Sequence, residues 1–142
     1  MLDRQRILAL IPHQGAMCLL DEAVEWDSAR ILCLARSHLA PDNPLRCGGR
    51  LGALAGVEYG LQAAALHGAL LAGQPQPVGY LAGLREVEFL ARYLDAPVLG
   101  VLRVEATLAL RQVAGLIYRF GIAAEDGRAL VVGRAVISLP PA

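Results

Sequence analysis

Apolar and small residues fill positions 51–73, LGALAGVEYGLQAAALHGALLAG, without a proline or an arginine. At about 3.6 residues per turn, this stretch predicts one helix of about six turns. A rotation of about 100° per residue places Glu58 on a largely apolar stripe of that helix. The other members of the stripe are Leu51, Leu54, Ala55, Leu61, Gln62, Ala65 and Ala69.

The opposite side of this helix is nearly bare, because it collects Gly56, Gly60 and Ala63 beside His67. A glycine inside a helix costs up to about 1 kcal/mol relative to alanine, so the glycines indicate close packing. We therefore expect a flat partner, such as the concave face of a sheet, to approach the helix backbone here.

The rest of the chain predicts strands around this helix. Short helical periodicity over residues 3–10 ends at Pro12, and the loop over residues 38–49 leads into the long helix. Alternation and turn signals predict a hairpin over residues 17–26 and 30–36, and strands over residues 78–89, 98–110, 113–124 and 130–139. We expect a single α+β domain over residues 1–142, in which an antiparallel sheet of consecutive hairpins curls around the helix and leaves an edge strand for a dimer.

Composition narrows the possible partners. Thirteen basic and thirteen acidic residues cancel, so nothing favours nucleic-acid binding. The chain is 56% hydrophobic and 18% charged, which indicates burial against another subunit. Cys18, Cys33 and Cys47 form no CxxC pair, so neither a disulfide framework nor a metal site is expected.

The long helix has the length of a membrane span, but its middle carries Glu58, Gln62 and His67. An acidic side chain at membrane depth costs roughly 2.5–3.5 kcal/mol, so we expect no membrane span. The apolar patch near the N-terminus is shorter than the core of a signal peptide, which predicts a cytoplasmic protein.

Three stretches resemble the hotdog-fold 3-hydroxyacyl-[acyl-carrier-protein] dehydratases. The first is residues 11–21, IPHQGAMCLLD, which are similar to the opening of that family. In the second, Glu58 and Gln62 match the Glu-x-x-x-Gln motif of its central helix. The third is residues 80–89, YLAGLREVEF, which resemble one of its strands. More narrowly, Pro-His-x-Gly-x-Met-x-Leu-Leu-Asp, together with NPLR at residues 43–46 and GVEY at residues 56–59, resembles the dehydratase-like proteins of aryl-polyene pigment pathways.

The resemblance implies a hotdog fold and dehydration of 3-hydroxyacyl thioesters on an acyl carrier protein, in fatty-acid-like or polyene biosynthesis. No cofactor or metal is implied, because this chemistry needs only an acid, a base and oxyanion donors. The implied partners are the acyl carrier protein and a second hotdog subunit, identical or related.

One departure from the family concerns the base. The family carries a histidine in Gly-His-Phe-Pro-Gly, fourteen residues ahead of the glutamate, and that position is Pro44 here. His38 lies six residues earlier on the same loop and is the first candidate for the base; its alternative role is to cap a turn. His13 lies in the segment that lines the acyl tunnel by resemblance, and is either a replacement base or a wall residue.

The remaining candidates follow from the long helix and the loop before it. Glu58 is expected to be the acid, because an apolar stripe raises the pKa of a carboxyl group; a packed structural carboxyl is the alternative. Gly48 and Gly49 offer backbone N–H groups near the helix N-terminus for the thioester oxygen. Gln62 is a substrate-binding candidate by resemblance, and His67 is expected to be structural.

Two other functions remain open. A thioesterase on the same fold would use Glu58 to activate water and would release a free acid. A non-catalytic acyl-binding subunit of a hetero-oligomeric dehydratase is favoured by the missing Gly-His-Phe-Pro-Gly histidine.

Overall fold

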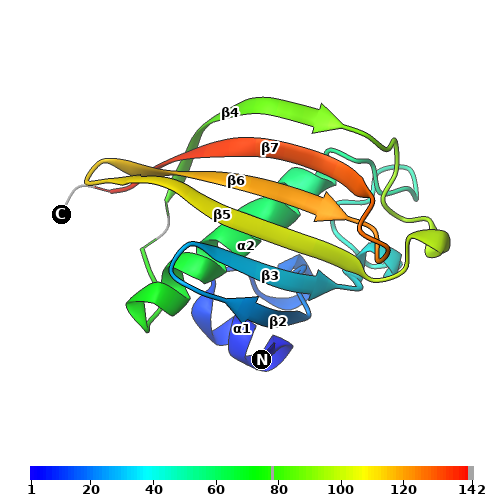
Figure 1. The fold of residues 1–142 in the computed structure, drawn as a ribbon. Helices are drawn as coiled ribbons and strands as arrows, with labels where there is room; N and C mark the ends of the chain where they lie inside the picture. Colours follow the sequence, from blue (N-terminus) through cyan, green and yellow to red (C-terminus); the bar gives the residue numbers. More distant parts are fainter. Residues whose placement is uncertain (78, 141–142) are drawn as a thin grey trace.

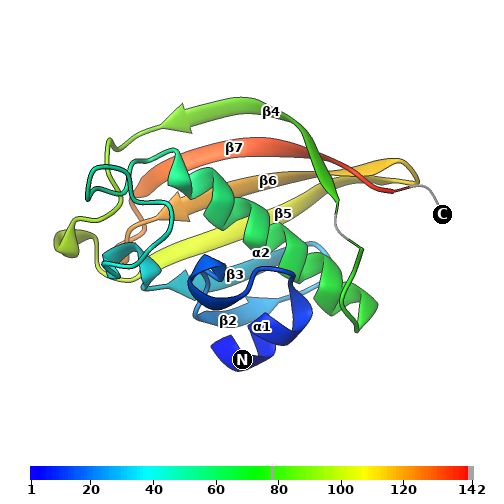
Figure 2. The same cartoon turned by 180° about the vertical axis from the view of Figure 1, so that it is seen from behind.

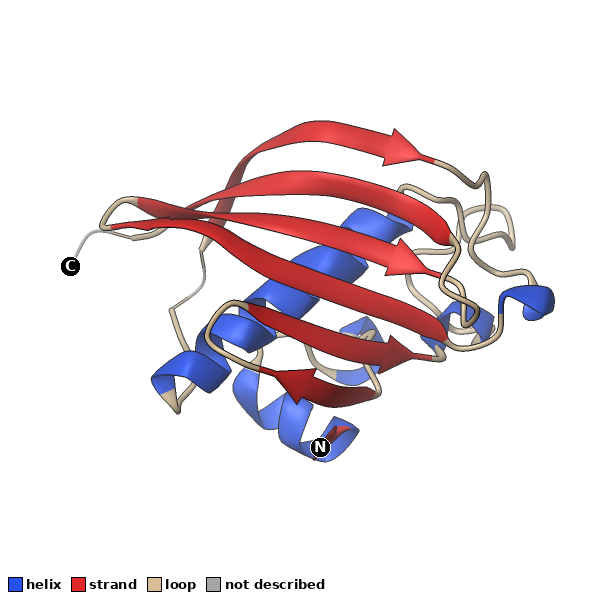
Figure 3. Ribbon diagram, viewed as in Figure 1, coloured by secondary structure: helices blue, strands red, loops and turns tan. Residues whose placement is uncertain are grey.

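A seven-stranded antiparallel sheet curls around one long helix, α2, in the computed structural model, which describes residues 1–77 and 79–140 (Figures 1 and 3). Along the sheet the strands lie in the order β1-β2-β3-β5-β6-β7-β4. The elements are β1 Leu2–Asp3, α1 Arg4–Leu10, β2 Glu22–Trp26, β3 Arg30–Ala35, α2 Ala55–Ala72, β4 Tyr80–Phe89, β5 Leu102–Gln112, β6 Gly115–Ala123 and β7 Ala129–Ser138. Short 3-10 helices occupy Gly15–Met17, Ser37–Leu39 and Pro97–Leu99.

The bare side of α2 faces the sheet, as the sequence predicts. A Cβ atom added to Gly60 would lie 2.6 Å from the Phe120 ring, and one added to Gly56 would lie 2.9 Å from Val131. His67 continues the same side, where its Nδ1 accepts a hydrogen bond from the Tyr118 hydroxyl at 2.7 Å and its Nε2 donates to the Asp27 carbonyl at 2.8 Å. From behind, α2 crosses the sheet and α1 lies beside it (Figure 2).

Gly60 allows this close approach, and Gly60→Ala is expected to lower the free energy of unfolding by about 1–3 kcal/mol through overpacking against Phe120. Gly68 is a matched control on the same helix, because a Cβ there meets no atom within 4 Å. Gly68→Ala is expected to raise the free energy of unfolding by up to about 1 kcal/mol, through helix propensity. Urea denaturation measures both, and equal effects at the two sites would contradict this account.

The long helix is shorter than the predicted residues 51–73. It begins at Ala55, because two of the residues before it bond to another segment. Ala53 N donates to Arg92 O and Leu94 N donates to Leu51 O, both at 2.9 Å. At the other end, Gly73 adopts a left-handed conformation with φ 73° and closes the helix. Among the described residues, no helix has the length and apolar character that crossing a membrane requires.

The predicted chain of consecutive hairpins is wrong at one strand. β4 pairs with β7 and not with β5, so it forms an edge of the sheet. The predicted strand over residues 98–110 begins only at Leu102, because Pro97–Leu99 forms a 3-10 helix in the connection from β4 to β5. The hairpin also begins later than predicted, at Glu22, and Val78, at the start of the strand predicted over residues 78–89, lies outside the described residues.

Candidate active site

His13 and Glu58 meet although 45 residues separate them in the sequence. Glu58 projects from the first turn of α2, and His13 follows α1 just after Pro12. His13 Nε2 lies 3.4 Å from Glu58 Oε1, and the two side chains are 25% and 32% exposed. A carboxylate only accepts hydrogen bonds, so a hydrogen bond in this contact requires the proton to be on His13 Nε2.

The pair lies in the wall of a cavity of about 240 Å³, here called the central cavity. Its other lining residues, which are mainly apolar, are Leu10, Pro12, Leu61, Ala65, Gln76, Pro77, Gly79, Leu81 and Ile137. A second hollow of about 420 Å³, the entry hollow, shares Glu58, Leu61 and Leu81 with it. A proton donor and a proton acceptor in an apolar cavity are the parts that acid–base chemistry on an apolar substrate needs.

Gln62 holds the segment that carries His13 against α2. Its Oε1 accepts a hydrogen bond from Leu19 N at 2.9 Å, and its Nε2 donates to Met17 O at 2.7 Å. The side chain is fully buried. Gln62 was a substrate-binding candidate, but both ends of its amide are engaged by backbone, so the structure gives it a positioning role.

The pKa of the Glu58 carboxyl is lowered from its ordinary value, and the prediction of a raised pKa is wrong. The hydrogen bond from His13 is the largest cause; burial opposes it, and the charge of His13 and a hydrogen bond from Gln62 add to it. The sequence showed the apolar stripe around Glu58 but not the histidine brought to it from another segment. Glu58 is therefore ionised at neutral pH.

His38, the first candidate for the base, lies away from this pair. It is fully buried and is not among the residues that line the central cavity or the entry hollow. Its Nε2 donates to Gly100 O at 2.8 Å, while Arg46 Nη2 donates to its backbone carbonyl at 3.0 Å. His38 thus packs the loop ahead of α2 against the chain near Gly100.

Burial lowers the pKa of the His38 imidazole, although the Gly100 carbonyl partly opposes this shift. In the unfolded chain the His38 imidazole binds a proton below about pH 6.5, whereas in the folded chain it does so only at lower pH. The free energy of unfolding is therefore expected to fall as the pH drops below about 6.5. His38→Gln keeps a donor for Gly100 O and removes this titration. Melting temperatures between about pH 7.5 and pH 5 should fall less steeply in the variant, and equal slopes would contradict the assignment.

Gly48 and Gly49 are not at the helix N-terminus, which corrects the expectation of an oxyanion site there. They form the tip of a turn with φ of 59° and 77°, closed by backbone hydrogen bonds of 2.8 and 3.2 Å between Cys47 and Arg50. Residues 51–54, which the sequence assigned to the helix, separate this turn from α2. The first N–H groups of α2 are already bonded, for example Gly56 N to Ala53 O at 2.9 Å.

The two arginines of this loop bind Asp95, a residue that the sequence analysis did not single out. Arg46 Nη1 lies 3.3 Å and Arg50 Nε 3.0 Å from Asp95 Oδ2. The hydrogen bond from Arg50 is the main reason that the pKa of Asp95 falls to about 2. Both arginines therefore tie the loop to the chain after β4, and no local motif around Asp95 could have shown this.

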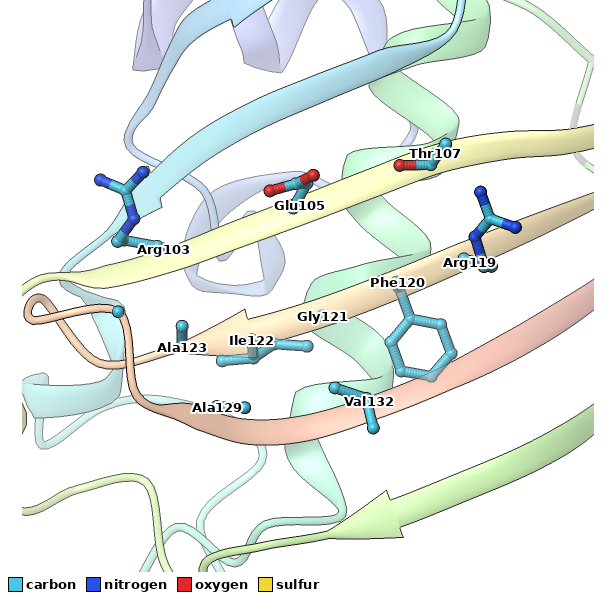
Figure 4. A pocket seen from close by; sticks show the side chains of 11 residues that line it. Arg103, Glu105, Thr107, Arg119, Phe120, Gly121, Ile122, Ala123, Ala129 and Val132 are labelled. Carbon is cyan, nitrogen blue, oxygen red and sulfur yellow. The ribbon is translucent and has the colours of Figure 1, made fainter.

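A separate hollow of about 360 Å³ lies on the outer face of the sheet (Figure 4). Arg103 and Glu105 extend from β5, and Arg119 from β6, away from α2. Glu105 accepts a hydrogen bond from Arg30 Nε at 3.2 Å. The His13–Glu58 pair, which lies at α2 on the other face, is not part of this hollow.

A family model named ApeP-like, described as ApeP dehydratase, matches residues 5–141. This match confirms the resemblance seen in the three sequence stretches. A search of curated protein sequences finds no match.

The fold is similar to those of several solved structures. The dehydratase heterocomplex ApeI:P from Xenorhabdus doucetiae matches with a TM-score of 0.81 and 20% identity, over 94% of this chain and 90% of that chain. An HP0420 homologue from Helicobacter felis matches with a TM-score of 0.64 and 15% identity, over 95% and 99%. A hypothetical thioesterase with coenzyme A from Streptococcus pneumoniae TIGR4 matches with a TM-score of 0.60 and 12% identity, over 84% and 85%. At these identities the structures establish the fold, and the predicted hotdog fold is confirmed.

Proposed function

Because the chain belongs to the family of ApeP-like dehydratases, we propose that its His13–Glu58 pair removes water from a 3-hydroxyacyl chain held as a thioester on an acyl carrier protein. The family match confirms dehydration as the activity expected from the sequence. The observation that carries the proposal is the 3.4 Å contact between His13 Nε2 and Glu58 Oε1 in the wall of an apolar cavity.

The electrostatics of the pair assign a role to each member. The Glu58 carboxylate removes the proton from C2, and the electron pair of that C–H bond forms the C2=C3 double bond. The C3–O bond breaks, and His13 donates its Nε2 proton to the departing hydroxyl, which leaves as water. A proton then returns from Glu58 to His13 across their contact. This assignment reverses the acid and base roles expected from the sequence, because the lowered pKa keeps Glu58 ionised at rest.

The surroundings of the pair support a carrier-bound substrate. The entry hollow reaches Glu58 from the side of Leu45 and Leu54, and the central cavity continues from Glu58 along α2. A thioester arm in the entry hollow therefore places C2 and C3 of the acyl chain beside Glu58 and His13. The apolar walls favour a hydrocarbon chain beyond them.

Thioester hydrolysis is a weaker candidate. A thioesterase named among the similar structures is 12% identical to this chain, a likeness that extends to the fold alone. The family match favours dehydration. The product separates the two activities, because hydrolysis yields a free acid and dehydration an enoyl thioester.

We also propose that the chain pairs with a second hotdog subunit along β4. This edge strand exposes apolar side chains, with Tyr80 68%, Leu84 39% and Phe89 48% exposed. An unpaired edge of this kind is suited to strand addition by another chain. The similar structure from Xenorhabdus doucetiae is titled a heterocomplex, which supports a related rather than an identical partner.

Mass spectrometry of a 3-hydroxyacyl carrier protein tests the activity, first with the chain alone and then with any hotdog subunit that copurifies with it. The expected result is loss of the mass of one water with the wild type, and a far slower loss with Glu58→Gln or His13→Gln. Release of free acid would support the hydrolase. Activity that requires the partner and survives both substitutions would identify this chain as a non-catalytic acyl-binding subunit.

A further inference from the structure

Three arginines lie side by side on the outer face of the sheet, the face turned away from α2. Cross-strand pairing sets Arg119 of β6 opposite Arg134 of β7, and Arg134 opposite Arg85 of β4. Residues directly opposite each other in an antiparallel pair point to the same face of the sheet. Arg119 points away from α2 (Figure 4), so all three side chains lie on the outer face. They are here called the arginine row.

The arginine row is unfavourable for the chain by itself, because like charges directly opposite each other in a sheet repel. Arg134 has one carboxylate nearby, since its Nε lies 3.5 Å from Oε2 of Glu86, a side chain that is 76% exposed. Among the residues that the structure describes, Arg85 and Arg119 form no ion pair. Anionic groups of a partner would supply the counter-charges that the fold does not.

Apolar side chains border the arginine row on one side. Ile117 of β6 and Val136 of β7 are paired across the strands, two residues along from the row. Side chains alternate between the two faces of a strand, so both lie on the outer face. Both are partly exposed, and Gly83 of β4, opposite Val136, leaves open space beside them. A partner that covers this surface must therefore carry acidic and apolar groups next to each other.

An amphipathic helix laid across the strands matches these dimensions. Neighbouring strands lie about 4.8 Å apart, so the row spans about 10 Å from Arg119 to Arg85. Side chains three or four residues apart on a helix are about 5–6 Å apart, and seven residues advance about 10.5 Å. Acidic side chains at positions i, i+3 and i+7 therefore place one carboxylate at each arginine, while the adjacent apolar side of the helix lies on Ile117 and Val136.

We propose that the outer face of β6, β7 and β4 binds an acidic amphipathic helix of another protein, through the arginine row and its apolar border. This surface is separate from the proposed active site, since none of its residues lines the central cavity or the entry hollow. A bound helix leaves the route of the acyl substrate open, and the inference does not depend on the proposed function.

Two other occupants fit this surface less well. A second copy of the chain lacks the required helix, because among the described helices α1 has no acidic residue and α2 has only Glu58. A flat anionic surface such as a membrane would also meet Glu88 and Glu105, which lie in the next row of the outer face, on the side away from the apolar border. A helix is narrow enough to cover the arginines without these carboxylates.

Fluorescence anisotropy with a labelled synthetic helix measures this binding. The peptide carries glutamates at i, i+3 and i+7 and leucines on the adjacent side, and a control peptide has the same composition with its glutamates spread around the helix. The purified chain should bind the first peptide more tightly than the control peptide. The affinity should fall as the salt concentration rises, because exposed charges are screened.

Substitutions in the arginine row should weaken this binding in steps. Arg119→Gln should cost about 1.5- to 5-fold, the value of one exposed ion pair, and the triple variant Arg85→Gln/Arg119→Gln/Arg134→Gln about tenfold or more. Arg103→Gln is the matched control, because Arg103 is exposed on the same face of β5, two rows away, and it should leave the affinity unchanged.

Glu86→Gly tests the row in the opposite direction. It removes the carboxylate beside Arg134, and glycine suits the φ of 54° at this position. Binding of the acidic peptide should become about 1.5- to 5-fold tighter.

Equal affinities for the two peptides, or equal effects of Arg119→Gln and Arg103→Gln, would overturn the inference. Binding to phosphatidylserine vesicles that depends on the arginine row, without binding of the acidic peptide, would assign this face to a membrane surface and would also overturn it.

Discussion

Glu58→Gln is expected to lower kcat/KM for dehydration by about 10²–10⁴-fold, the usual contribution of a general acid or base. The amide keeps the size of the side chain and a hydrogen-bond acceptor for His13, but it cannot take the C2 proton. Substrate binding should change little, because the walls of the central cavity remain. Steady-state kinetics should therefore show the loss in kcat rather than in KM.

A matched control is Glu25→Gln on β2, an exposed glutamate that pairs with Arg30 at 3.2 Å and lies outside the cavities at Glu58. It should leave kcat and KM unchanged. His13→Gln should cost about as much as Glu58→Gln, and the double variant little more than either, since the two side chains act as one unit. Independent losses that multiply in the double variant would show that the pair does not act together.

The sequence was sufficient to predict how α2 meets the sheet. Its glycine and alanine positions recur at helical spacing, and that spacing alone brings Gly56 and Gly60 to one side. The structure shows the sheet against this side, because only there can Val131 and Phe120 approach the backbone. The apolar stripe with Glu58 is likewise a property of local periodicity, and two of its members, Leu61 and Ala65, line the central cavity beside Glu58.

Strand order and the acid–base pair depend on contacts between distant segments. The alternation in residues 80–89 predicts a strand but not its neighbour, and β4 pairs with β7 rather than with the next strand in the chain. His13 was named as a wall residue or replacement base, yet its contact with Glu58 depends on how the segment after α1 is held. The predicted pKa of Glu58 was therefore wrong in direction.

Contacts between distant segments also explain why the expectations for His38 and for Gly48 and Gly49 are corrected. The position of His38 on the loop before α2 favours it as the base, and only the fold reveals that its Nε2 bonds to the carbonyl of Gly100, 62 residues later. Gly48 and Gly49 were placed beside the helix because apolar composition continues through residues 51–54. Those residues bond instead to the chain at Arg92 and Leu94, which moves the helix start away from the glycines.

Gln62 is expected to control both stability and catalysis, because it joins α2 to the segment that carries His13. Gln62→Leu leaves the buried N–H of Leu19 without its acceptor and the carbonyl of Met17 without its donor. An unsatisfied buried polar group costs about 1–3 kcal/mol, so the free energy of unfolding should fall by at least this amount. Urea denaturation measures this loss.

The catalytic consequence separates positioning from folding alone. Once Gln62→Leu releases the segment, His13 no longer stays within reach of Glu58 Oε1, and a displacement of about 1 Å is enough to cost about 10²-fold in kcat.

Gln62→Glu retains an acceptor for Leu19 N and should recover part of the stability. Its carboxylate would lie one helical turn from Glu58, and like-charge repulsion would raise the pKa of the Glu58 carboxyl. The acid limb of the pH profile of kcat/KM should therefore move to higher pH in Gln62→Glu. An unmoved acid limb in Gln62→Glu, together with wild-type kcat in folded Gln62→Leu, would show that Gln62 supports the fold without positioning His13.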